Sequence, residues 1–225
     1  MSIDSLSEAR KITAMNITAL PDPDRRGATR ARLLDAARSL FVEIGYHATR
    51  PQDIARRAGI GHGTFYLHFH DKQACFLAFA EDARQELEEF LRARRARRPG
   101  AEAQIRALLE ALLDHAEQHP GVLRAAMSDL AVISGDTPAP GLLDRWAASF
   151  VAGLAPAIAA GSAHADYNLD LLGHLLIGTL RGMLHARLAA GRADLVDTAT
   201  LFLLRVLRPD GVAAADNLFL TYGAS

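Results

Sequence analysis

The strongest constraint on the fold lies in residues 49–72, where two short helical patterns flank a turn of three or four residues. Ala55 in the first pattern is small enough for the second helix to cross it closely. Gly59, four residues later, suits a turn position that needs a positive φ. Phe65 and Phe69 supply apolar side chains that can hold the second helix on a core. The pattern predicts a helix-turn-helix, whose second helix enters the major groove of DNA.

The flanking residues predict a helix on each side of this motif. Upstream, Thr29 is a candidate N-cap, and apolar residues then recur at helical spacing until Gly45 stops the helix. The two helices of the motif are expected at about 51–58 and 62–69. Downstream, Asp71 can cap a long helix that reaches about Arg98.

The rest of the chain also carries helical periodicity. Helices are expected at about 101–119, 122–134, 142–160, 167–190 and 193–208, with Pro156 kinking or ending the third of them. Alternating β-branched runs and Asn-Gly or Asp-Gly hairpins are absent from the sequence. We therefore predict an all-α fold of about nine helices, with an N-terminal three-helix domain and a larger C-terminal helical domain.

Charge divides the chain in the same way. Residues 25–72 hold nine Lys/Arg and four Asp/Glu, whereas residues 73–225 hold fourteen Lys/Arg and eighteen Asp/Glu. Residues 25–72 are thus basic and residues 73–225 acidic, which indicates that only the N-terminal part binds a polyanion. The expected domains are a flexible tail (1–26), a helix-turn-helix domain (27–72) and a helical effector-binding and dimerisation domain (73–225).

The composition of the chain indicates in which part of the cell it acts. Among the 225 residues, no apolar run is long enough to span a bilayer, and charged residues interrupt the N-terminal segment where a signal peptide would be apolar. Cys75 is the single cysteine, so no intramolecular disulfide can form. These features predict a cytoplasmic protein without a membrane partner. Cys75 is either a packed thiol or a redox sensor, and its apolar neighbours favour packing.

Specific motifs resemble those of the tetracycline-repressor (TetR) family. Residues 60–72, which read IGHGTFYLHFHDK, resemble the recognition-helix signature of that family, and residues 41–46 and 53–59 match as well. The resemblance covers about 45 residues. It implies a homodimer that joins through the last two long helices, at about 167–190 and 193–208. It also implies two DNA-binding heads, a small-molecule effector in the C-terminal domain, and repression of a palindromic operator.

Side-chain chemistry and the resemblance together give candidate DNA contacts. Gly63 lets the recognition helix approach the DNA closely, and Tyr66 can donate its hydroxyl to a phosphate. Phosphate contacts are also expected from helix starts. Base contacts are expected from the exposed side of the second helix. The full predicted set is Thr49, Gln52, His62, Gly63, Thr64, Tyr66, Leu67, His68 and Lys72.

Two positions depart from the family pattern. Gly61 replaces the usual hydroxyl residue, so a phosphate contact and a stronger helix cap are expected to be missing. Leu67 replaces a polar or aromatic residue and suits a thymine methyl group. Among the basic residues Arg25, Arg26 and Arg30, solvation and a DNA-contacting arm are alternative predictions.

Weaker patterns lie in the C-terminal half. His115 and His119 are four residues apart and could present two metal ligands, but only Asp114 or Glu117 is near in sequence, so a solvated face is preferred. The basic run at 92–98 suits either a solvated helix end or an electrostatic approach to DNA. No metal or cofactor is predicted.

One polar stripe marks the helix expected at 167–190. It contains Asp170, His174, Gly178, Arg181 and His185, opposite a mainly apolar side that includes Leu175. The stripe is solvated, lies at a dimer seam or contacts an effector, and these alternatives stay open.

The candidate effector residues come from two helices. They are Trp146, Phe150, His174 and Arg181, with core packing as the alternative for the first two.

Two other functions compete with that of an effector-responsive regulator. The first is an enzyme, but the sequence has no Gly-rich phosphate loop, nucleophile elbow or paired metal-ligand motif, so we predict no catalysis. The second is a DNA-binding module that acts without an effector. About 150 residues follow the motif, which is more than dimerisation needs, and this favours the regulator.

Overall fold

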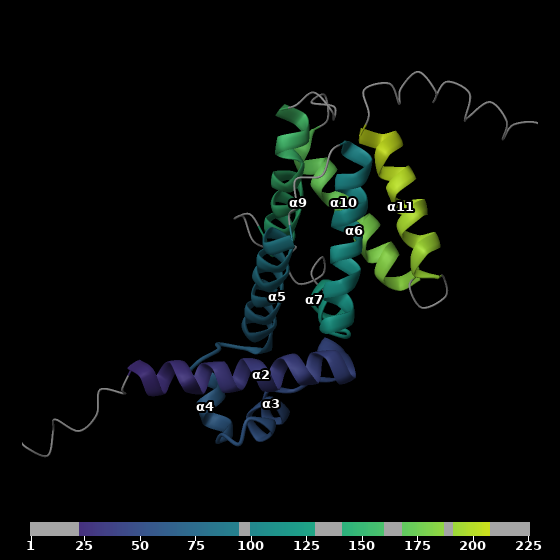
Figure 1. Cartoon of the computed structure of the whole chain (residues 1–225). Helices are drawn as coiled ribbons and strands as arrows, with labels where there is room; N and C mark the ends of the chain where they lie inside the picture. Colours follow the sequence, from purple (N-terminus) through teal and green to yellow (C-terminus); the bar gives the residue numbers. More distant parts are fainter. Residues whose placement is uncertain (1–22, 95–99, 129–140, 160–167, 187–190, 208–225) are drawn as a thin grey trace, which may run out of the picture.

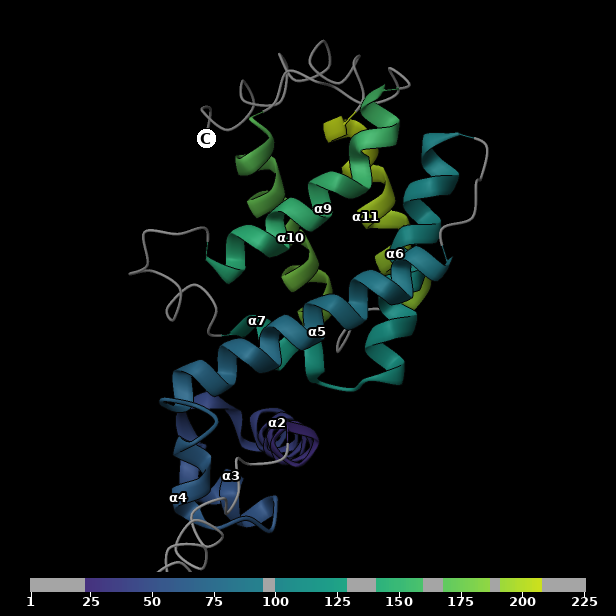
Figure 2. The same ribbon diagram turned by 90° about the vertical axis from the view of Figure 1, so that its left-hand side faces the viewer.

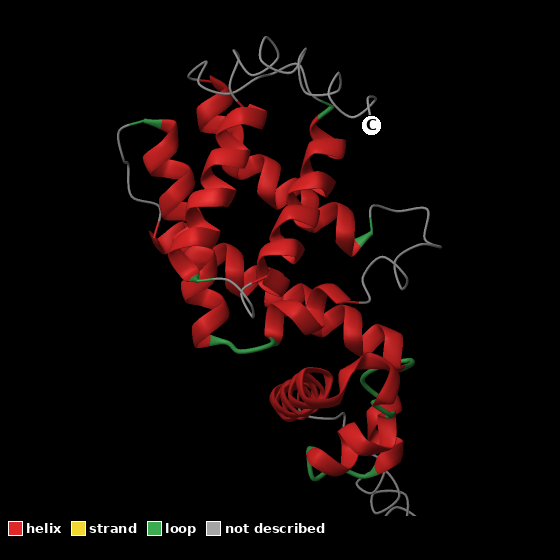
Figure 3. Cartoon of the chain, turned by 90° about the vertical axis from the view of Figure 1, so that its right-hand side faces the viewer, coloured by secondary structure: helices red, strands yellow, loops and turns green. Residues whose placement is uncertain are grey.

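The computed structural model describes residues 23–94, 100–128, 141–159, 168–186 and 191–207. All nine elements in these ranges are helices, joined by loops (Figures 1 and 3). In chain order they are α2 (Pro23–Ala48), α3 (Pro51–Arg57), α4 (His62–Tyr66), α5 (Lys72–Arg94), α6 (Ala101–Gln118), α7 (Val122–Ser128), α9 (Leu142–Ala159), α10 (Leu169–Ala186) and α11 (Arg192–Leu207). The predicted all-α class is confirmed.

The first three helices form a small unit at one end of the molecule. α2 lies across the molecule, with α3 and α4 beneath it and the larger helical body above it (Figure 1). Apolar side chains from all three helices are buried in this unit, including Leu33, Phe41, Ile54 and Phe65, each at most 1% exposed. Burial of about 25 cal/mol per Å² of apolar surface stabilises such a core.

An aromatic cluster joins this unit to the body. The Phe41 ring on α2 lies 5.2 Å from the Phe76 ring and 5.5 Å from the Phe79 ring, both on α5. These edge and tilted arrangements are favourable for aromatic pairs. α5 then continues away from α2 into the body, so it physically links the two parts of the chain (Figure 2).

The start of α2 differs from the sequence prediction. The helix begins at Pro23, and the Thr29 hydroxyl donates to the Arg25 carbonyl oxygen at 2.8 Å instead of capping the helix. Proline is tolerated in a first turn, and the carboxylate of Asp24 there suits the helix dipole. The prediction of Thr29 as N-cap was wrong because these two residues start the helix earlier.

The other helix signals are met in part. Gly45, with φ 80° and ψ 168°, kinks α2 where the sequence predicted its end, and the helix continues to Ala48. Asp71 caps α5 by accepting a hydrogen bond from the Ala74 backbone N–H at 2.7 Å. α4 ends at Tyr66, earlier than predicted, and α9 continues past Pro156, which therefore does not end it.

The body is formed by α5, α6, α7, α9, α10 and α11 (Figure 2). α9 and α10 cross closely at Gly173, where a Cβ atom would lie only 2.7 Å from the Ala147 carbonyl oxygen. α6 packs beside α11, and an Arg106–Asp197 ion pair joins them at 2.5 Å. No helix within the described ranges is both long and apolar enough to cross a membrane.

α10 and α11 expose apolar side chains on the single chain. Leu171 and Leu175 of α10 are 60% and 62% exposed, and Leu201 and Phe202 of α11 are 54% and 51% exposed. The sequence pattern places Leu175 on the apolar side of α10, together with the buried Leu172 and Met183. The buried residues of the helix are Leu172, Gly173, Ile177, Leu180 and Met183. The apolar residues of α10 therefore divide between the core and an exposed strip.

Candidate DNA-binding surface

The helix-turn-helix forms as the sequence predicts. Ala55 is 1% exposed, and Gly59 has a φ of 64° in the turn between α3 and α4. The Ile60 backbone N–H donates to the Ala55 carbonyl oxygen at 2.9 Å, which closes the turn. A side chain at position 59 would be strained by this φ and would also meet Arg32 Nη2 at 3.4 Å.

α4 divides into a buried side and an exposed side. Phe65 and Phe69 are buried at 0% and 4% exposure, as predicted. His62, Gly63, Tyr66 and Leu67 are exposed, with Leu67 70% exposed, whereas Thr64 and His68 are half-buried. The residues chosen as candidate base contacts therefore lie on or beside one outward surface, which is hereafter the α4 surface.

The Tyr66 ring is held in place although half of it is exposed. Its centroid lies 5.3 Å from that of His62 and 5.3 Å from that of Phe65, both in edge arrangements. The ring therefore packs on the domain, as predicted. A side chain held this way loses little further freedom when it binds a ligand.

Two glycines of α4 have different surroundings. Gly61 is the N-cap residue and provides no side-chain cap hydrogen bond, as expected from its departure from the family pattern. A Cβ atom at Gly63 would meet nothing within 4 Å among the described residues. The fold itself therefore places no steric demand for glycine at position 63.

Thr49 lies inside the domain. It is 1% exposed, and its hydroxyl donates to the Gly45 carbonyl oxygen at 2.7 Å. The hydroxyl thus satisfies the carbonyl that the kink at Gly45 leaves without a helical partner. The predicted phosphate contact of the Thr49 side chain does not fit this position, so Thr49 leaves the candidate set.

Lys72 has structural partners. Its ammonium Nζ donates to the Tyr46 carbonyl oxygen at 2.8 Å and lies 4.1 Å from the centroid of the Tyr46 ring. A cation at the C-terminal end of α2 is favoured by the helix dipole. The predicted phosphate contact of Lys72 therefore competes with this role in capping α2.

Other polar residues surround the α4 surface. Gln52 is exposed in the first turn of α3, where the prediction placed it. Arg25 and Arg26 lie on α2, and the Arg30 guanidinium lies 5.0 Å from the centroid of the Phe69 ring. Burial, together with Arg26 and Arg30, lowers the pKa of His68, so this half-buried imidazole is neutral at neutral pH.

Sequence reasoning missed two arginines that hold the motif together. Arg32 on α2 donates to the Ala58 carbonyl oxygen at 2.6 Å, at the end of α3. Arg57 on α3 forms a two-pronged pair with Glu43 on α2, at 2.7 and 2.8 Å. Their partners are 26 and 14 residues away, so only the packed fold reveals them.

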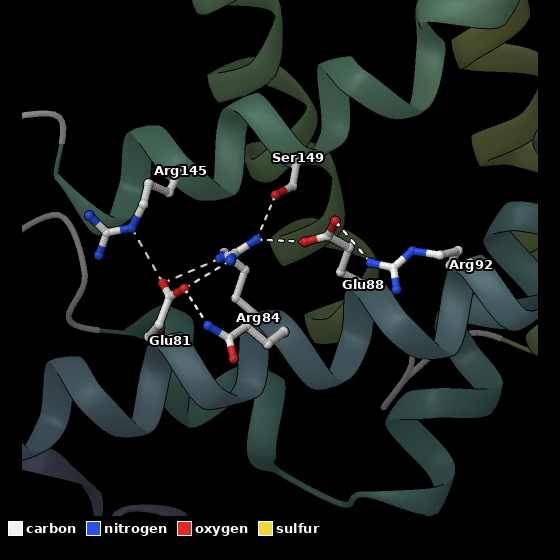
Figure 4. Close-up of polar contacts among 7 residues, drawn as sticks. Glu81, Arg84, Glu88, Arg92, Arg145 and Ser149 are labelled. Atoms are coloured by element: carbon white, nitrogen blue, oxygen red, sulfur yellow. Dashed lines mark hydrogen bonds and ion pairs between the residues drawn. The ribbon is translucent and has the colours of Figure 1, made fainter.

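An ion-pair network connects α5 to α9 (Figure 4). Glu81 pairs with Arg84 at 2.8 Å and with Arg145 of α9 at 3.4 Å. Arg84 also donates to the Ser149 hydroxyl at 2.8 Å. The hydrogen bond from Arg84 is the main cause that lowers the pKa of Glu81 to about 2. Glu81 therefore stays charged at neutral pH, and the network fastens α5, which packs on α2, to α9 of the body.

The arginines at the C-terminal end of α5 contact residues of their own helix. Arg92 pairs with Glu88 at 3.3 Å, and the Arg94 guanidinium lies 3.5 Å from the centroid of the Phe90 ring. This end of α5 lies away from α3 and α4 (Figure 1), which favours a solvated helix end over DNA contact.

Cys75 is buried, and burial raises the pKa of its thiol to about 12, so it is a packed thiol.

The four candidate effector residues differ in burial. Trp146 is 1% exposed, and its indole N–H has no hydrogen-bond partner among the described residues. Phe150 is half-buried, whereas Arg181 is exposed. His174 contacts the Asp144 carboxylate at 3.2 Å and the Asp170 carbonyl oxygen at 2.7 Å. Trp146 and Phe150 belong to the interior of the body, and Arg181 does not.

The histidine pair also differs from its prediction. His115 is 0% exposed, so a solvated face was wrong for this residue. Burial and the neighbouring His119 lower the pKa of His115 to about 4. Asp114 and Glu117 pair with Arg192 on α11, whereas the carboxylate nearest the histidines is Glu86 of α5, 3.1 Å from His119 Nδ1.

Known proteins share this motif and this fold. The family described as "Bacterial regulatory proteins, tetR family" matches residues 33–79. The transcriptional activator FasR of Mycolicibacterium smegmatis is 35% identical over 98 residues, which is 44% of this chain and 43% of FasR. The transcriptional repressor KstR2 of Rhodococcus jostii is 43% identical over 53 residues, which is 24% of this chain and 26% of KstR2. The matches thus span less than half the length of these relatives.

Solved structures extend the likeness to the body. RolR, solved in complex with resorcinol, aligns over 86% of this chain and 94% of its own, with a TM-score of 0.64 and 23% identity. At this identity the likeness concerns the fold. The structure thus defines a helix-turn-helix protein with a helical second domain. Residues 33–79 thus match the TetR family, and the helical fold resembles that of RolR. The curated relatives named here are regulators of transcription, not enzymes.

Proposed function

We propose that this chain is a transcriptional regulator that binds operator DNA through the α4 surface and changes its DNA affinity when a small molecule binds the body. The main observation behind this proposal is the helix-turn-helix. The apolar side of α4 is buried in it, whereas Gly63, Tyr66 and Leu67 are exposed. A recognition helix in this position enters the major groove. Because the proposed target of the protein is DNA, we propose that it acts in the cytoplasm.

The DNA contacts proposed from the structure are of two kinds. His62, Thr64 and Leu67 are candidates for base edges, with His68 beside them. Gln52 and Tyr66 are candidates for phosphate oxygens, and Lys72 adds its charge near the same surface. Gly63 allows the backbone of α4 to approach the DNA.

A homodimer is the proposed active form. The exposed apolar strip on α10 and α11, formed by Leu171, Leu175, Leu201 and Phe202, is suited to burial against a second copy. Gly178 and Gly182 on α10 are exposed, and small residues allow helices to approach closely. Two copies related by a two-fold axis would present two recognition helices to a palindromic operator.

An effector in the body is supported by Trp146. Its buried indole N–H lacks a partner among the described side chains, and buried donors are normally hydrogen-bonded. An effector with an acceptor atom would satisfy this donor, while Phe150 would offer an apolar contact. A role for His174 or Arg181 in effector binding is not proposed, because neither is buried with Trp146.

The proposed mechanism is a population shift. α5 runs from the DNA-binding unit into the body, and the Glu81–Arg84–Arg145 contacts fasten it to α9 (Figure 4). An effector that favours one position of α5 changes the spacing of the two recognition helices. It must bind the two spacings with different affinity, because equal affinity shifts nothing. Release from the operator, and hence repression, is the proposed direction.

The proposal is tested by titrating the purified chain onto the DNA upstream of its own gene at two salt concentrations, with and without a panel of small hydrophobic and aromatic compounds. We expect specific binding that weakens with salt and is relieved by one class of compound. Sequence-independent binding alone would contradict the proposal. Specific binding that no compound changes would favour a DNA-binding module without an effector.

Leu67 gives a finer prediction about base preference. It is 70% exposed, so Leu67→Ala removes little buried surface and leaves the fold intact. If its side chain contacts a thymine methyl, the variant loses preference at one position of each half-site, by about 1 kcal/mol or more. The check is an operator-preference assay with single base substitutions, and an unchanged preference at every position would rule the contact out.

A further inference from the structure

The junction of α2, α5 and α6 contains a cluster of ionisable side chains that DNA binding does not use. Glu86 comes from α5, and His115 and His119 come from α6. One ligand atom from each of these three residues lies within 4.8 Å of those of the other two. This set is hereafter the junction cluster. Arg38 of α2 borders it, with its guanidinium 2.8 Å from a Glu86 carboxylate oxygen.

His115 is the unusual member of the junction cluster. It is 0% exposed, and neither ring nitrogen has a hydrogen-bond partner within the described part of the chain. A neutral imidazole carries one donor and one acceptor, and burial removes both from water. The ring stands at 80° to that of Phe90 with centroids 5.0 Å apart, and this contact satisfies neither nitrogen. A ligand that accepts the lone pair of the ring would satisfy the unprotonated nitrogen.

The donor set is that of a transition-metal site. Two imidazoles four residues apart on one helix and a carboxylate from a second helix match the two-histidine, one-carboxylate sets that hold zinc and leave a coordination position open. Ligand atoms about 2.0–2.1 Å from a tetrahedral ion lie roughly 3.3 Å from one another. The Glu86 oxygen and His119 Nδ1 are already 3.1 Å apart. A ligand nitrogen of His115 lies within 4.8 Å of both groups, so the three side chains must draw closer together around the ion.

Arg38 competes for the same carboxylate. Besides its pair with Glu86, its Nη2 atom lies 3.4 Å from His119 Nδ1. A divalent cation between these groups would repel the guanidinium, and the Arg38 side chain, 32% exposed, can turn toward water. Occupation by a metal would then remove the contact between α2 and α5 and bridge α5 to α6 through the ion.

From these contacts we infer that Glu86, His115 and His119 bind a divalent transition-metal ion such as Zn²⁺, and that binding releases Arg38 from α5. The sequence predicted no metal, because Glu86 is 29 residues from His115 and on another helix. The consequence for DNA rests on the proposed function: the site lies where the DNA-binding unit meets the body, so its occupation is an input to the DNA-binding unit.

The direct test is a calorimetric titration of the full chain, without a histidine tag and freed of metal by a chelator, with Zn²⁺ alone. We expect one ion per chain. Glu86→Gln and His119→Gln should each weaken binding at least about tenfold. The matched controls Glu89→Gln and His185→Gln, both exposed and outside the junction cluster, should bind as the parent chain does. His115 is buried, so these two partly exposed ligands carry the test.

Arg38→Gln provides a second, opposite readout. Removing the competing guanidinium frees the carboxylate, so this variant should bind Zn²⁺ several-fold more tightly than the parent chain. Absence of Zn²⁺ binding by the parent chain, or equal affinity in Glu86→Gln and His119→Gln, would overturn the site. Unchanged affinity in Arg38→Gln would overturn the release of Arg38.

DNA binding is then measured in chelator and with Zn²⁺. A shifted operator affinity in the parent chain, absent in His119→Gln, is the expected result. Operator binding that is identical in both conditions would overturn the coupling. If the chain bound no DNA in either condition, the proposed function would fail, while the zinc titration would still decide whether the site exists.

Discussion

At Gly63, the requirements of protein stability and of the proposed DNA binding differ most clearly. A methyl group at this position would meet nothing among the described side chains, whereas it would stand on the surface that we propose faces DNA. Glycine in a helix is also less stable than alanine by roughly 0.5–1 kcal/mol. The fold alone would therefore favour alanine here, and only an external partner makes glycine useful.

The prediction for Gly63→Ala follows from this difference. The variant should be equally stable or more stable by up to about 1 kcal/mol in thermal or denaturant unfolding. Its affinity for operator DNA should fall, because the methyl group keeps the α4 backbone from the DNA. An unchanged affinity in an electrophoretic or fluorescence titration would show that α4 does not approach DNA at this residue.

Glu81 gives a prediction about pH. Its folded pKa, about 2, lies below the ordinary value of 4.5, so its ion pairs stabilise the fold above the ordinary pKa. That contribution is lost as pH falls from about 5 to about 2. Glu81→Gln should therefore lower the free energy of unfolding at pH 7, on the order of 2 kcal/mol. The difference from the parent chain should shrink steadily below pH 5.

The matched control for this prediction is Glu89→Gln, which removes an exposed carboxylate from the same helix. It should change the free energy of unfolding by less than about 0.5 kcal/mol at either pH. The measurement is denaturant unfolding at several pH values. A gap between Glu81→Gln and the parent chain that stayed constant down to pH 2 would contradict the account of the network.

Between elements, the crossing of α9 and α10 depends on one glycine. A Cβ atom at Gly173 would lie 2.7 Å from the Ala147 carbonyl oxygen and 2.8 Å from its Cβ atom, both of which are fixed by the helix. The helices cannot keep this approach with a larger residue. The crossing therefore sets where Trp146, the neighbour of Ala147, lies in the body.

Gly173→Ala should destabilise the chain by about 1–3 kcal/mol, because the helices must separate. Gly27→Ala is the control: it also lies inside a helix, and its Cβ would meet nothing within 4 Å among the described residues. It should be neutral or stabilising. Thermal unfolding of both variants checks this. Equal stability of the two would mean that α9 and α10 leave room for a Cβ atom at position 173.

How far the sequence alone predicts the structure depends on whether the signals are local. Gly59 and Asp71 act through their own backbone geometry or that of near neighbours, and both were read correctly, whereas Gly45 kinks α2 without ending it. Thr49 and Thr29 were misread because a hydroxyl can serve several carbonyls, and only the packed chain shows which one it meets.

Features made by distant residues lay beyond the sequence analysis. Glu86 meets His119 across two helices, and periodicity alone does not give that register. On α10, the pattern separated polar from apolar residues, but it did not separate Leu172 in the core from Leu175 at the surface. The candidate DNA contacts lie within one contiguous segment, so the sequence could propose them together, whereas an effector site assembled from several helices needs the packed fold.

At the scale of the whole molecule, the exposed strip on α10 and α11 is the surface on which we propose that a second copy packs. Leu175→Glu places a charge in the strip without entering the core of the single chain, because Leu175 is 62% exposed. We expect this variant to sediment as a monomer. It should also bind an operator much more weakly, because one chain then engages one half-site at a time.

Ile44→Glu is the control for this change. It introduces the same charge at an exposed apolar residue, 50% exposed on α2, outside the strip. This variant should sediment as the parent chain does in analytical ultracentrifugation. A dimer that survived Leu175→Glu unchanged would place the interface elsewhere.

The most direct test of the central claim, that α4 surfaces of two copies read a DNA sequence, is selection of binding sites by the full chain from a pool of random duplexes. The account predicts enrichment of a palindrome whose half-sites are centred about 10 base pairs apart, or a multiple of that. Gly63→Ala should enrich it weakly or not at all. Recovery of no common sequence, or the same enrichment by Gly63→Ala, would contradict the claim.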